Sequence, residues 1–128
     1  MIFVTGGTGL VGAHMLLTLI QAGEEVNASF RSDKSREYTR NLFSFYGKEE
    51  LFSAINWVQL DLENSYDVSE AMKGVKHVYH CAAMVDLQNS SAMRLIEANV
   101  TLTANLVNAA LLSEVEAFCH VSSVATLA

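Results

Sequence analysis

Short apolar runs alternate along this chain with longer segments in which apolar residues recur every three or four positions. The short runs predict buried strands, and the longer segments predict helices. The expected strands span residues 2–5, 25–31, 56–60, 76–81 and 117–121. The expected helices span residues 10–22, 35–52 with a possible break at Gly47, 65–74 with Ser65 as the cap, and a long segment from Ser90 or Ser91 to about residue 113.

This alternation of strand and helix predicts an α/β fold, and the order of the elements narrows the topology. Strands that are apolar throughout, rather than at every second position, are typical of a parallel sheet covered on both faces. Right-handed crossovers then favour five strands in the order 3-2-1-4-5, a doubly wound sheet with helices on both faces. In the last helix, one stripe is expected to face the sheet: Ile96, Val100, Thr103, Val107 and Ala110.

Composition limits the classes of partner. The chain has 128 residues, 51% of them apolar, and a net charge of −6. These values are typical of one folded domain over residues 1–128, and they argue against a nucleic-acid partner or an anionic membrane surface. No apolar run reaches the length of about 18 residues that a membrane span needs. Cys81 and Cys119 lie in apolar runs and are expected to be buried free thiols, which favours a reducing, cytoplasmic location.

The first twelve residues carry the strongest chemical signal. Strand 2–5 runs into a turn with the pattern Thr-Gly-x-x-Gly-x-x-Gly, formed by Thr5, Gly6, Gly9 and Gly12. Gly6 permits a tight turn, Gly9 lets the backbone approach a ligand, and Gly12 lets the helix pack close to the strand. The backbone at the start of the helix, which includes Leu10 and Val11, then offers amide groups to a diphosphate. A P-loop is excluded, because Ala13-His14 stand where Lys-Ser/Thr would be required.

The end of the second strand bears on which dinucleotide would bind. NAD-specific sites usually place Asp or Glu at this position, whereas this chain has Arg31, followed by Lys34. A guanidinium can grip a 2′-phosphate with two hydrogen bonds. The sequence therefore favours NADP, while Asp33 leaves NAD open.

Together with four further segments, the glycine turn resembles the extended short-chain dehydrogenase/reductases, in the NAD-dependent epimerase/dehydratase family. The segments are Asp61-Leu62, His80-Cys81-Ala82-Ala83, Asn99 within its helix, and Val121-Ser122-Ser123. The resemblance covers nearly the whole chain and implies a Rossmann domain. Arg31 and the segment 80–86 look closer to the hydroxysteroid dehydrogenase and dihydroflavonol reductase branch than to sugar-nucleotide epimerases.

The resemblance also implies roles for individual residues. Asp61 and Leu62 would contact the adenine, and Ala82 and Ala83 would lie along the cofactor ribose. Asn99 would orient a water near the catalytic lysine. Ser123, with Ser122 as second choice, would be the catalytic serine. The expected activity is interconversion of a carbonyl and an alcohol on a small-molecule substrate with NADP(H), with NAD-dependent sugar-nucleotide epimerisation or dehydration as the alternative.

The family's catalytic tyrosine, which has a lysine four positions later, has no counterpart in this chain. Residues 42, 50, 70 and 83, four positions after each of the four tyrosines, are Leu, Glu, Glu and Ala. We therefore expect a part of a longer enzyme, inactive by itself and a possible homodimer when whole. The alternative is a short, non-catalytic dinucleotide-binding or redox-sensing module.

No metal site is expected. His80 with Cys81 and Cys119 with His120 are adjacent pairs on strands, and adjacent side chains point to opposite faces of a sheet.

Overall fold

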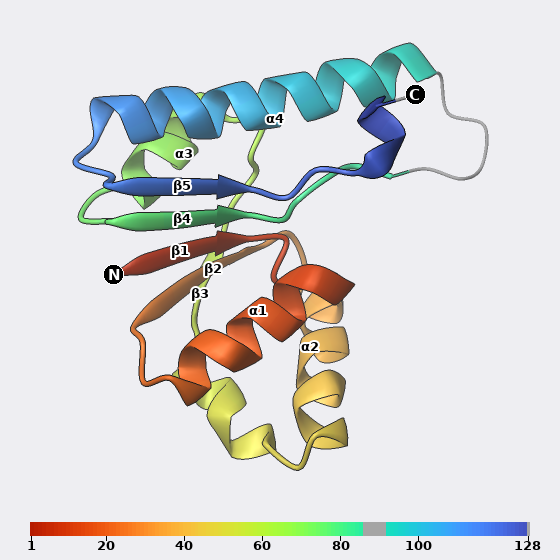
Figure 1. The fold of residues 1–128 in the computed structure, drawn as a ribbon, viewed down its shortest axis with the longest axis vertical. Helices are drawn as coiled ribbons and strands as arrows, with labels where there is room; N and C mark the ends of the chain where they lie inside the picture. The colour runs from red at the N-terminus through yellow and green to blue at the C-terminus, as the bar shows by residue number, and fades with distance from the viewer. Residues whose placement is uncertain (86–91, 128) are drawn as a thin grey trace.

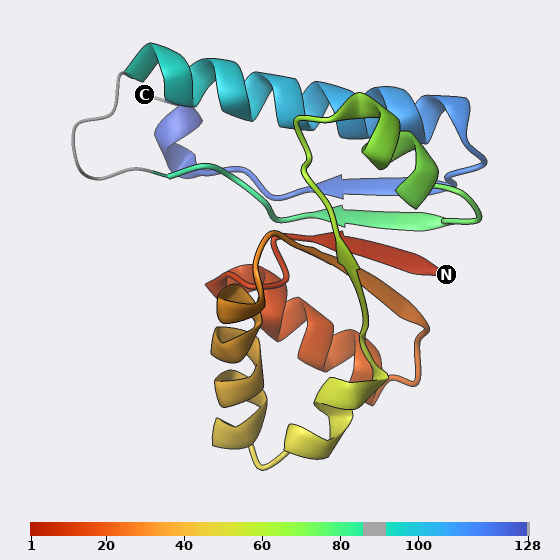
Figure 2. The ribbon, with the colours of Figure 1, turned by 180° about the vertical axis from the view of Figure 1, so that it is seen from behind.

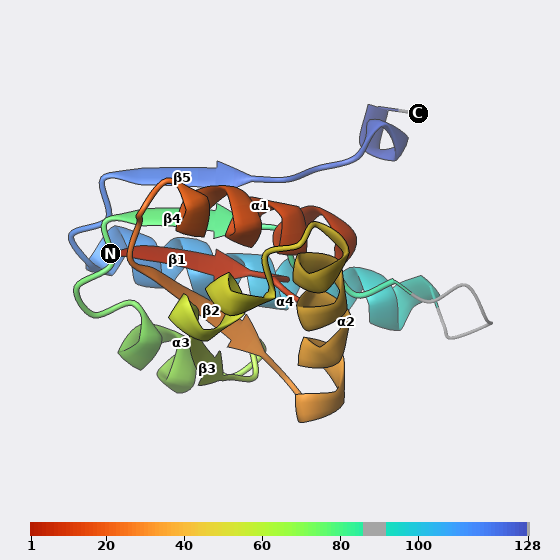
Figure 3. The same cartoon turned by 90° about the horizontal axis from the view of Figure 1, so that it is seen from below.

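The computed structural model describes residues 1–85 and 92–127, which form one five-stranded parallel sheet. Its strands lie in the order β3-β2-β1-β4-β5, which confirms the predicted topology. Each pair of neighbouring strands is parallel, as the arrows of β4 and β5 show in Figure 3, so the carboxyl ends of the strands meet at one edge of the sheet. The strands are β1 (Ile2–Thr5), β2 (Val26–Phe30), β3 (Asn56–Gln59), β4 (His77–His80) and β5 (Ala117–His120).

Helices cover both faces of this sheet, as predicted. Figures 1 and 2 show α1 and α2 on one side of the strands and α3 and α4 on the other. The helices are α1 (Leu10–Gln21), α2 (Asp33–Phe45), α3 (Ser65–Ala71) and α4 (Ala92–Leu112), with short 3₁₀ helices η1 (Glu49–Ala54) and η2 (Val124–Leu127).

The central strand β1 is buried on both faces, which explains its continuous apolar run. Ile2 and Val4 belong to the core cluster with α1 and α2, whereas Phe3 between them belongs to the cluster with α3 and α4. All four residues of β1 are buried. Successive side chains of a strand alternate between faces, so a strand between two helical layers needs an apolar residue at nearly every position.

The ends of the helices follow their turn residues. Gly23 and Gly47 have φ angles of +81° and +63°, in the region that favours glycine, and they follow α1 and α2. Gly47 thereby confirms the predicted break. The cap of α3 was assigned wrongly, because the side chain of Asn64, not Ser65, accepts from the amides of Tyr66 and Asp67. The predicted start of α4 at Ser90 or Ser91 lies outside the described residues.

The predicted buried stripe of α4 is wrong in most of its members. Ile96 and Val100 are each 61% exposed, and the helix buries a different set: Ala98, Leu102, Leu106, Ala109 and Ala110. Apolar residues lie all around α4, so periodicity alone could not fix its rotation about its axis. By length and composition α4 could also cross a membrane, a test that core helices of soluble proteins pass as well. Its buried residues pack on the sheet.

The two thiols are less enclosed than expected. Cys81 is half-buried just after β4, and Cys119 is exposed on β5. Cys119 lies on β5, one of the two edge strands of the described sheet, and only its neighbour Phe118 packs against the core cluster of α3 and α4.

Candidate functional site

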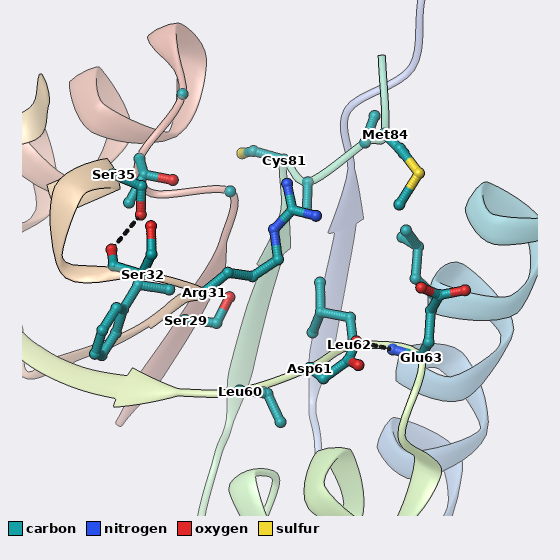
Figure 4. A pocket seen from close by; sticks show the side chains of 17 residues that line it. Ser29, Arg31, Ser32, Ser35, Leu60, Asp61, Leu62, Glu63, Cys81 and Met84 are labelled. Carbon is teal, nitrogen blue, oxygen red and sulfur yellow. Dashed lines mark hydrogen bonds between the residues drawn. The ribbon is translucent and has the colours of Figure 1, made fainter. Parts of the chain in front are cut away.

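A cavity of about 600 Å³ opens at the carboxyl ends of the strands, at the point where the strand order reverses. Open α/β sheets bind their ligands at this point. Figure 4 shows that its walls come from the turn after β1, the end of β2, the segment after β3 and the segment after β4. The lining residues are Gly6, Thr8, Gly9, Ser29, Phe30, Arg31, Ser32, Ser35, Leu60, Asp61, Leu62, Glu63, Cys81, Ala82, Ala83, Met84 and Leu102.

The glycine turn is shaped by contacts that leave no space for side chains. Gly6 has a φ of +70°, and a Cβ added to it would lie 2.6 Å from the Ala82 nitrogen. A Cβ added to Gly12 would collide with the carbonyl oxygen of Gly6. Gly12 therefore lets α1 pack against the turn itself, whereas the sequence predicts close packing of the helix against the strand. Gly9 meets only Gly6 oxygen, at 3.4 Å, so the fold itself tolerates a Cβ there.

The N-terminus of α1 has backbone amide donors for which the described residues provide no acceptor. The amide of Gly9 donates to Gly6 oxygen at 2.9 Å, but α1 has no side-chain cap and no acidic residue in its first turn. The amides of Leu10, Val11 and Gly12 have no acceptor within the helix, because the first turn of any helix lacks them. Backbone donors and the positive end of the helix dipole together suit a diphosphate.

Arg31 extends into the cavity from the end of β2, as Figure 4 shows. Within the described residues its guanidinium makes no hydrogen bond or ion pair, so its donors remain available to a ligand. Ser32 and Ser35 line the same wall, and Ser35 donates its hydroxyl to the Ser32 carbonyl at 2.6 Å. Lys34 is exposed and does not line the cavity.

Asp33, the residue that kept NAD open, is engaged elsewhere. Its carboxylate accepts from Arg36 at 2.6 Å, and its side chain is 84% exposed outside the cavity lining. Asp33 could contact a ribose only by leaving its ion pair with Arg36.

The segment after β3 contributes Asp61 and Leu62 to the opposite wall. Asp61 accepts from the amide of Glu63 at 3.0 Å, which shapes the turn. Asn105 of α4 donates to the carbonyls of Leu62 and Glu63, both at 3.0 Å. The predicted adenine contacts thus lie on a loop fastened to the long helix.

The segment after β4 brings Ala82 and Ala83 to the cavity. Asn99 fixes this segment: it accepts from the Met84 amide at 2.7 Å and donates to the Met84 carbonyl at 2.9 Å and to the Leu95 carbonyl at 2.9 Å. Its side chain is therefore committed to the main chain, and the water that the resemblance implies would need another donor or acceptor. Thr5 is fully buried and does not line the cavity.

Ser122 and Ser123 follow β5 and do not line the cavity. Both are exposed, and the Ser123 carbonyl accepts from the amide and the hydroxyl of Thr126 at 3.1 and 2.7 Å. Leu10, Val11 and Gly12 also lie outside the lining, at the start of α1 beside it. The structure thus gathers Gly6, Gly9, Arg31, Asp61, Leu62, Ala82 and Ala83 around one cavity.

Several lining residues escaped the sequence analysis, notably Ser29, Ser32 and Ser35. Ser32 and Ser35 come shortly after Arg31 at the carboxyl end of β2. Their closeness in sequence to a side chain expected to bind phosphate could have identified them as site residues. Cys81 also lines the cavity, and burial, with a smaller effect of Cys119, raises the pKa of its thiol. In the described ranges no three His, Cys, Asp or Glu side chains gather as a metal site would require.

Comparisons with known proteins agree with this geometry. The NAD dependent epimerase/dehydratase family matches residues 2–128. A putative dihydroflavonol 4-reductase from Synechocystis is 33% identical, over 98% of this chain and 33% of its own length. A 3-beta-hydroxysteroid dehydrogenase from Mycolicibacterium neoaurum is 30% identical, over 95% of this chain and 31% of its own length.

Solved structures give the same result. The protein gox2253 is 31% identical with a TM-score of 0.81, over 99% of this chain and 35% of that one. A UDP-glucuronic acid 4-epimerase from Bacillus cereus, solved in complex with NAD, is 25% identical with a TM-score of 0.73, over 95% of this chain and 39% of that one. The chain therefore spans about a third of the length of the curated relatives it matches.

Proposed function

Because the chain belongs to the NAD dependent epimerase/dehydratase family, we propose that it is the dinucleotide-binding part of an oxidoreductase that uses NADP(H). The intact protein would interconvert a carbonyl and an alcohol on a small-molecule substrate. One observation carries the proposal: an uncapped helix N-terminus without acidic residues faces a cavity at the switch point of the sheet.

The residues around this cavity fit a dinucleotide in shape and in charge. Gly6 and Gly12 have no space for a Cβ, so the backbone of the turn forms the cavity wall itself. The first-turn amides of α1 would bind the diphosphate, and Asp61 with Leu62 would contact the adenine. Bound there, the cofactor would supply or accept the hydride. Ala82 and Ala83 would border its ribose, because small side chains leave space beside the backbone.

The preference for NADP rests on Arg31 and its neighbours. The Arg31 guanidinium has no partner in the described residues, whereas Asp33, the carboxylate nearest to it in the sequence, is paired with Arg36. Two serine hydroxyls, on Ser32 and Ser35, border the same wall. A 2′-phosphate would gain charge-assisted hydrogen bonds from this set, whereas a plain 2′-hydroxyl would find Asp33, the carboxylate just after β2, already paired with Arg36.

Ser123 remains the proposed contact to the reacting oxygen, with Ser122 as the second choice. Both follow β5, the neighbour of β4, whose own extension lines the cavity. The proton would be exchanged by a tyrosine with a lysine four positions later, a pair that residues 1–128 do not contain.

Titration of the chain with NADPH and with NADH, followed by cofactor fluorescence, tests this proposal. The variant Arg31→Ala should weaken NADPH binding by about 10- to 100-fold, because a charge-assisted hydrogen bond contributes roughly 1.5–3 kcal/mol. NADH binding should change little. The matched control is Arg40→Ala, which removes the same charge from a side chain that lies over the Phe52 ring, outside the cavity.

The outcomes separate the parts of the proposal. Equal losses for both cofactors in Arg31→Ala would refute the NADP preference and leave a general dinucleotide site. Tighter binding of NADH than of NADPH by the unmodified chain would favour an NAD-dependent epimerase or dehydratase, the activity of the Bacillus cereus neighbour. No binding of either cofactor at millimolar concentration would overturn the proposed function.

A further inference from the structure

His80, the last residue of β4, is fully buried beside the cavity but does not line it. Both ring nitrogens are engaged. Nδ1 lies 2.7 Å from the hydroxyl of Thr5, and Nε2 lies 2.9 Å from the hydroxyl of Thr103. The proposed function assigns no task to this imidazole, although it joins the ends of two central strands to the long helix.

The hydrogen bonds of Thr5 determine which nitrogen carries the proton. Its hydroxyl accepts from the Ala82 amide at 3.3 Å, and Thr5 is fully buried. In the described part of the chain, His80 Nδ1 is the one acceptor that its O–H proton reaches. Thr5 therefore donates to Nδ1, and Nε2–H donates to Thr103, which is only half-buried. The opposite tautomer would leave the Thr5 proton buried without a partner, which is costly.

The Ala82 amide held by Thr5 is also the point at which the two walls of the cavity touch. A Cβ on Gly6 would lie 2.6 Å from the Ala82 nitrogen and 2.7 Å from the Cys81 oxygen. The glycine turn thus packs directly on the backbone after β4. A small shift of Ala82 would change the separation of the turn, expected to bind the diphosphate, from Ala82 and Ala83, expected to border the ribose.

We propose that His80 is a positioning residue of the dinucleotide cavity: it orients the Thr5 hydroxyl, which holds the Ala82 amide and thereby sets the distance between the glycine turn and the segment after β4. This role rests on the proposed function of the cavity. The hydrogen-bonded bridge from Thr103 through His80 and Thr5 to the Ala82 amide is a property of the protein alone. Burial, and to a lesser degree His120, lowers the pKa of His80 to about 4, so Nδ1 keeps its lone pair at neutral pH.

Two matched substitutions separate positioning from plain stability. Thr5→Val and Thr103→Val remove the same hydroxyl from the two sides of the same imidazole, but only Thr5 contacts Ala82. Both variants should lower the melting temperature. Thr5→Val should in addition weaken NADPH binding by about tenfold, whereas Thr103→Val should change it less than about threefold.

Two substitutions of the histidine itself give a second pair. Asn at position 80 keeps an acceptor near the place of Nδ1, whereas Gln places its amide nearer that of Nε2. His80→Asn should therefore retain NADPH affinity within about threefold, and His80→Gln should lose about tenfold. A purely structural role would make affinity follow stability in both variants.

Two measurements on the protein without cofactor test the bridge independently of cofactor binding. The ¹⁵N shifts of His80 should show a protonated Nε2 and an unprotonated Nδ1. Hydrogen exchange of the Ala82 amide should speed up by at least about tenfold in Thr5→Val and not in Thr103→Val.

The results distinguish the two proposals. If the unmodified chain binds neither NADPH nor NADH but the shifts and the exchange behave as stated, the proposed function fails and the bridge stands. If the chain binds NADPH and the two threonine variants weaken it equally, or if His80 carries its proton on Nδ1, the positioning role is overturned.

Discussion

Two stretches of backbone border the cavity, and they are held in place by different means. The turn after β1, residues 6–9, is shaped locally: Gly6 adopts a positive φ, and Gly9 donates to the Gly6 carbonyl three residues away. The segment after β4, residues 81–85, is held by side chains distant in sequence, Thr5 and Asn99. The first turn owes its shape chiefly to glycines, which have no Cβ, although Thr39 of α2 also donates its hydroxyl to the Gly7 carbonyl at 2.8 Å. The second depends on hydrogen bonds across the fold.

This difference predicts how each region fails. A side chain added at Gly6 or Gly12 has no space and must displace backbone, which changes the fold and the cavity together. A hydrogen bond removed from the segment after β4 leaves the strands in place and loosens only the cavity wall. Substitutions at these two glycines should therefore be costly and all-or-none, and those that remove a hydrogen bond from the segment after β4 should be graded.

The largest effect is expected for Gly12→Ala. The new Cβ would collide with the Gly6 carbonyl oxygen and lie 2.9 Å from the Gly7 nitrogen. Because backbone atoms cannot rotate away as side chains do, we expect a loss of about 3 kcal/mol in the free energy of unfolding, measured by urea titration. NADPH binding should be lost with it.

Gly9→Ala is the matched control within the same turn. Gly9 has φ −99° and ψ 175°, which any residue adopts, and its added Cβ meets only Gly6 oxygen at 3.4 Å. The free energy of unfolding should fall by about 1 kcal/mol or less. Equal stability losses in the two variants would show that the turn is not shaped by the close approach of Gly12.

Acid should loosen the second region more than the first. The second region is held by Thr5, whose hydroxyl is oriented by a side chain that titrates, His80. The folded protein keeps His80 neutral down to about pH 4, whereas the unfolded chain protonates it near its ordinary pKa of 6.5. The unfolded state thus binds more protons between these values, and stability falls as the pH drops from 6.5 to 4. The contribution of His80 to this fall is at most about 3 kcal/mol.

The measurement is urea unfolding of the unmodified chain and of His80→Asn at pH 7 and at pH 4.5. The stability advantage of the unmodified chain should shrink on acidification, because the variant lacks the group that titrates. Carboxylates and the other three histidines are common to both proteins, so they cancel in the difference. An advantage that stays constant across this range would contradict the buried neutral imidazole.

The sequence predicted the first region better than the second for a physical reason. The tight turn at Gly6 and the break at Gly47 depend on residues near each other in the chain, and the structure confirms them. The strand order, also confirmed, follows from the alternation of strands and helices and from the handedness of crossovers. The rotation of α4 depends on what the helix meets, and its predicted stripe through Ile96 and Val100 was wrong. Apolar residues lie around the whole helix, so only the tertiary contacts decide which face is buried.

The same reasoning applies to individual site residues. The glycines and Arg31 could be nominated from local pattern, and they do border the cavity or shape its wall. Thr5 was nominated as a cofactor contact, but its partners are His80 and Ala82, both at least 75 positions away. No local signal announces a hydrogen bond between the ends of two strands, because their pairing is known only once the sheet has formed.

Apart from the control substitutions, the smallest effect, and the finest test of the comparison, is expected for Asn99→Ala. The side chain makes three hydrogen bonds, two of them to Met84, and its loss leaves backbone groups half-buried without partners. We expect a loss of about 2 kcal/mol in the free energy of unfolding, partly offset by the better helix propensity of Ala.

Asn41→Ala on exposed α2 gains the same propensity without losing a hydrogen bond of the described residues, so it should leave stability nearly unchanged. Hydrogen exchange should then show faster exchange at Met84 in Asn99→Ala while the amides of β1 and β4 stay protected. Loss of protection throughout the sheet would mean that the segment after β4 is part of the cooperative core, and the distinction between a rigid turn and an adjustable wall would fail.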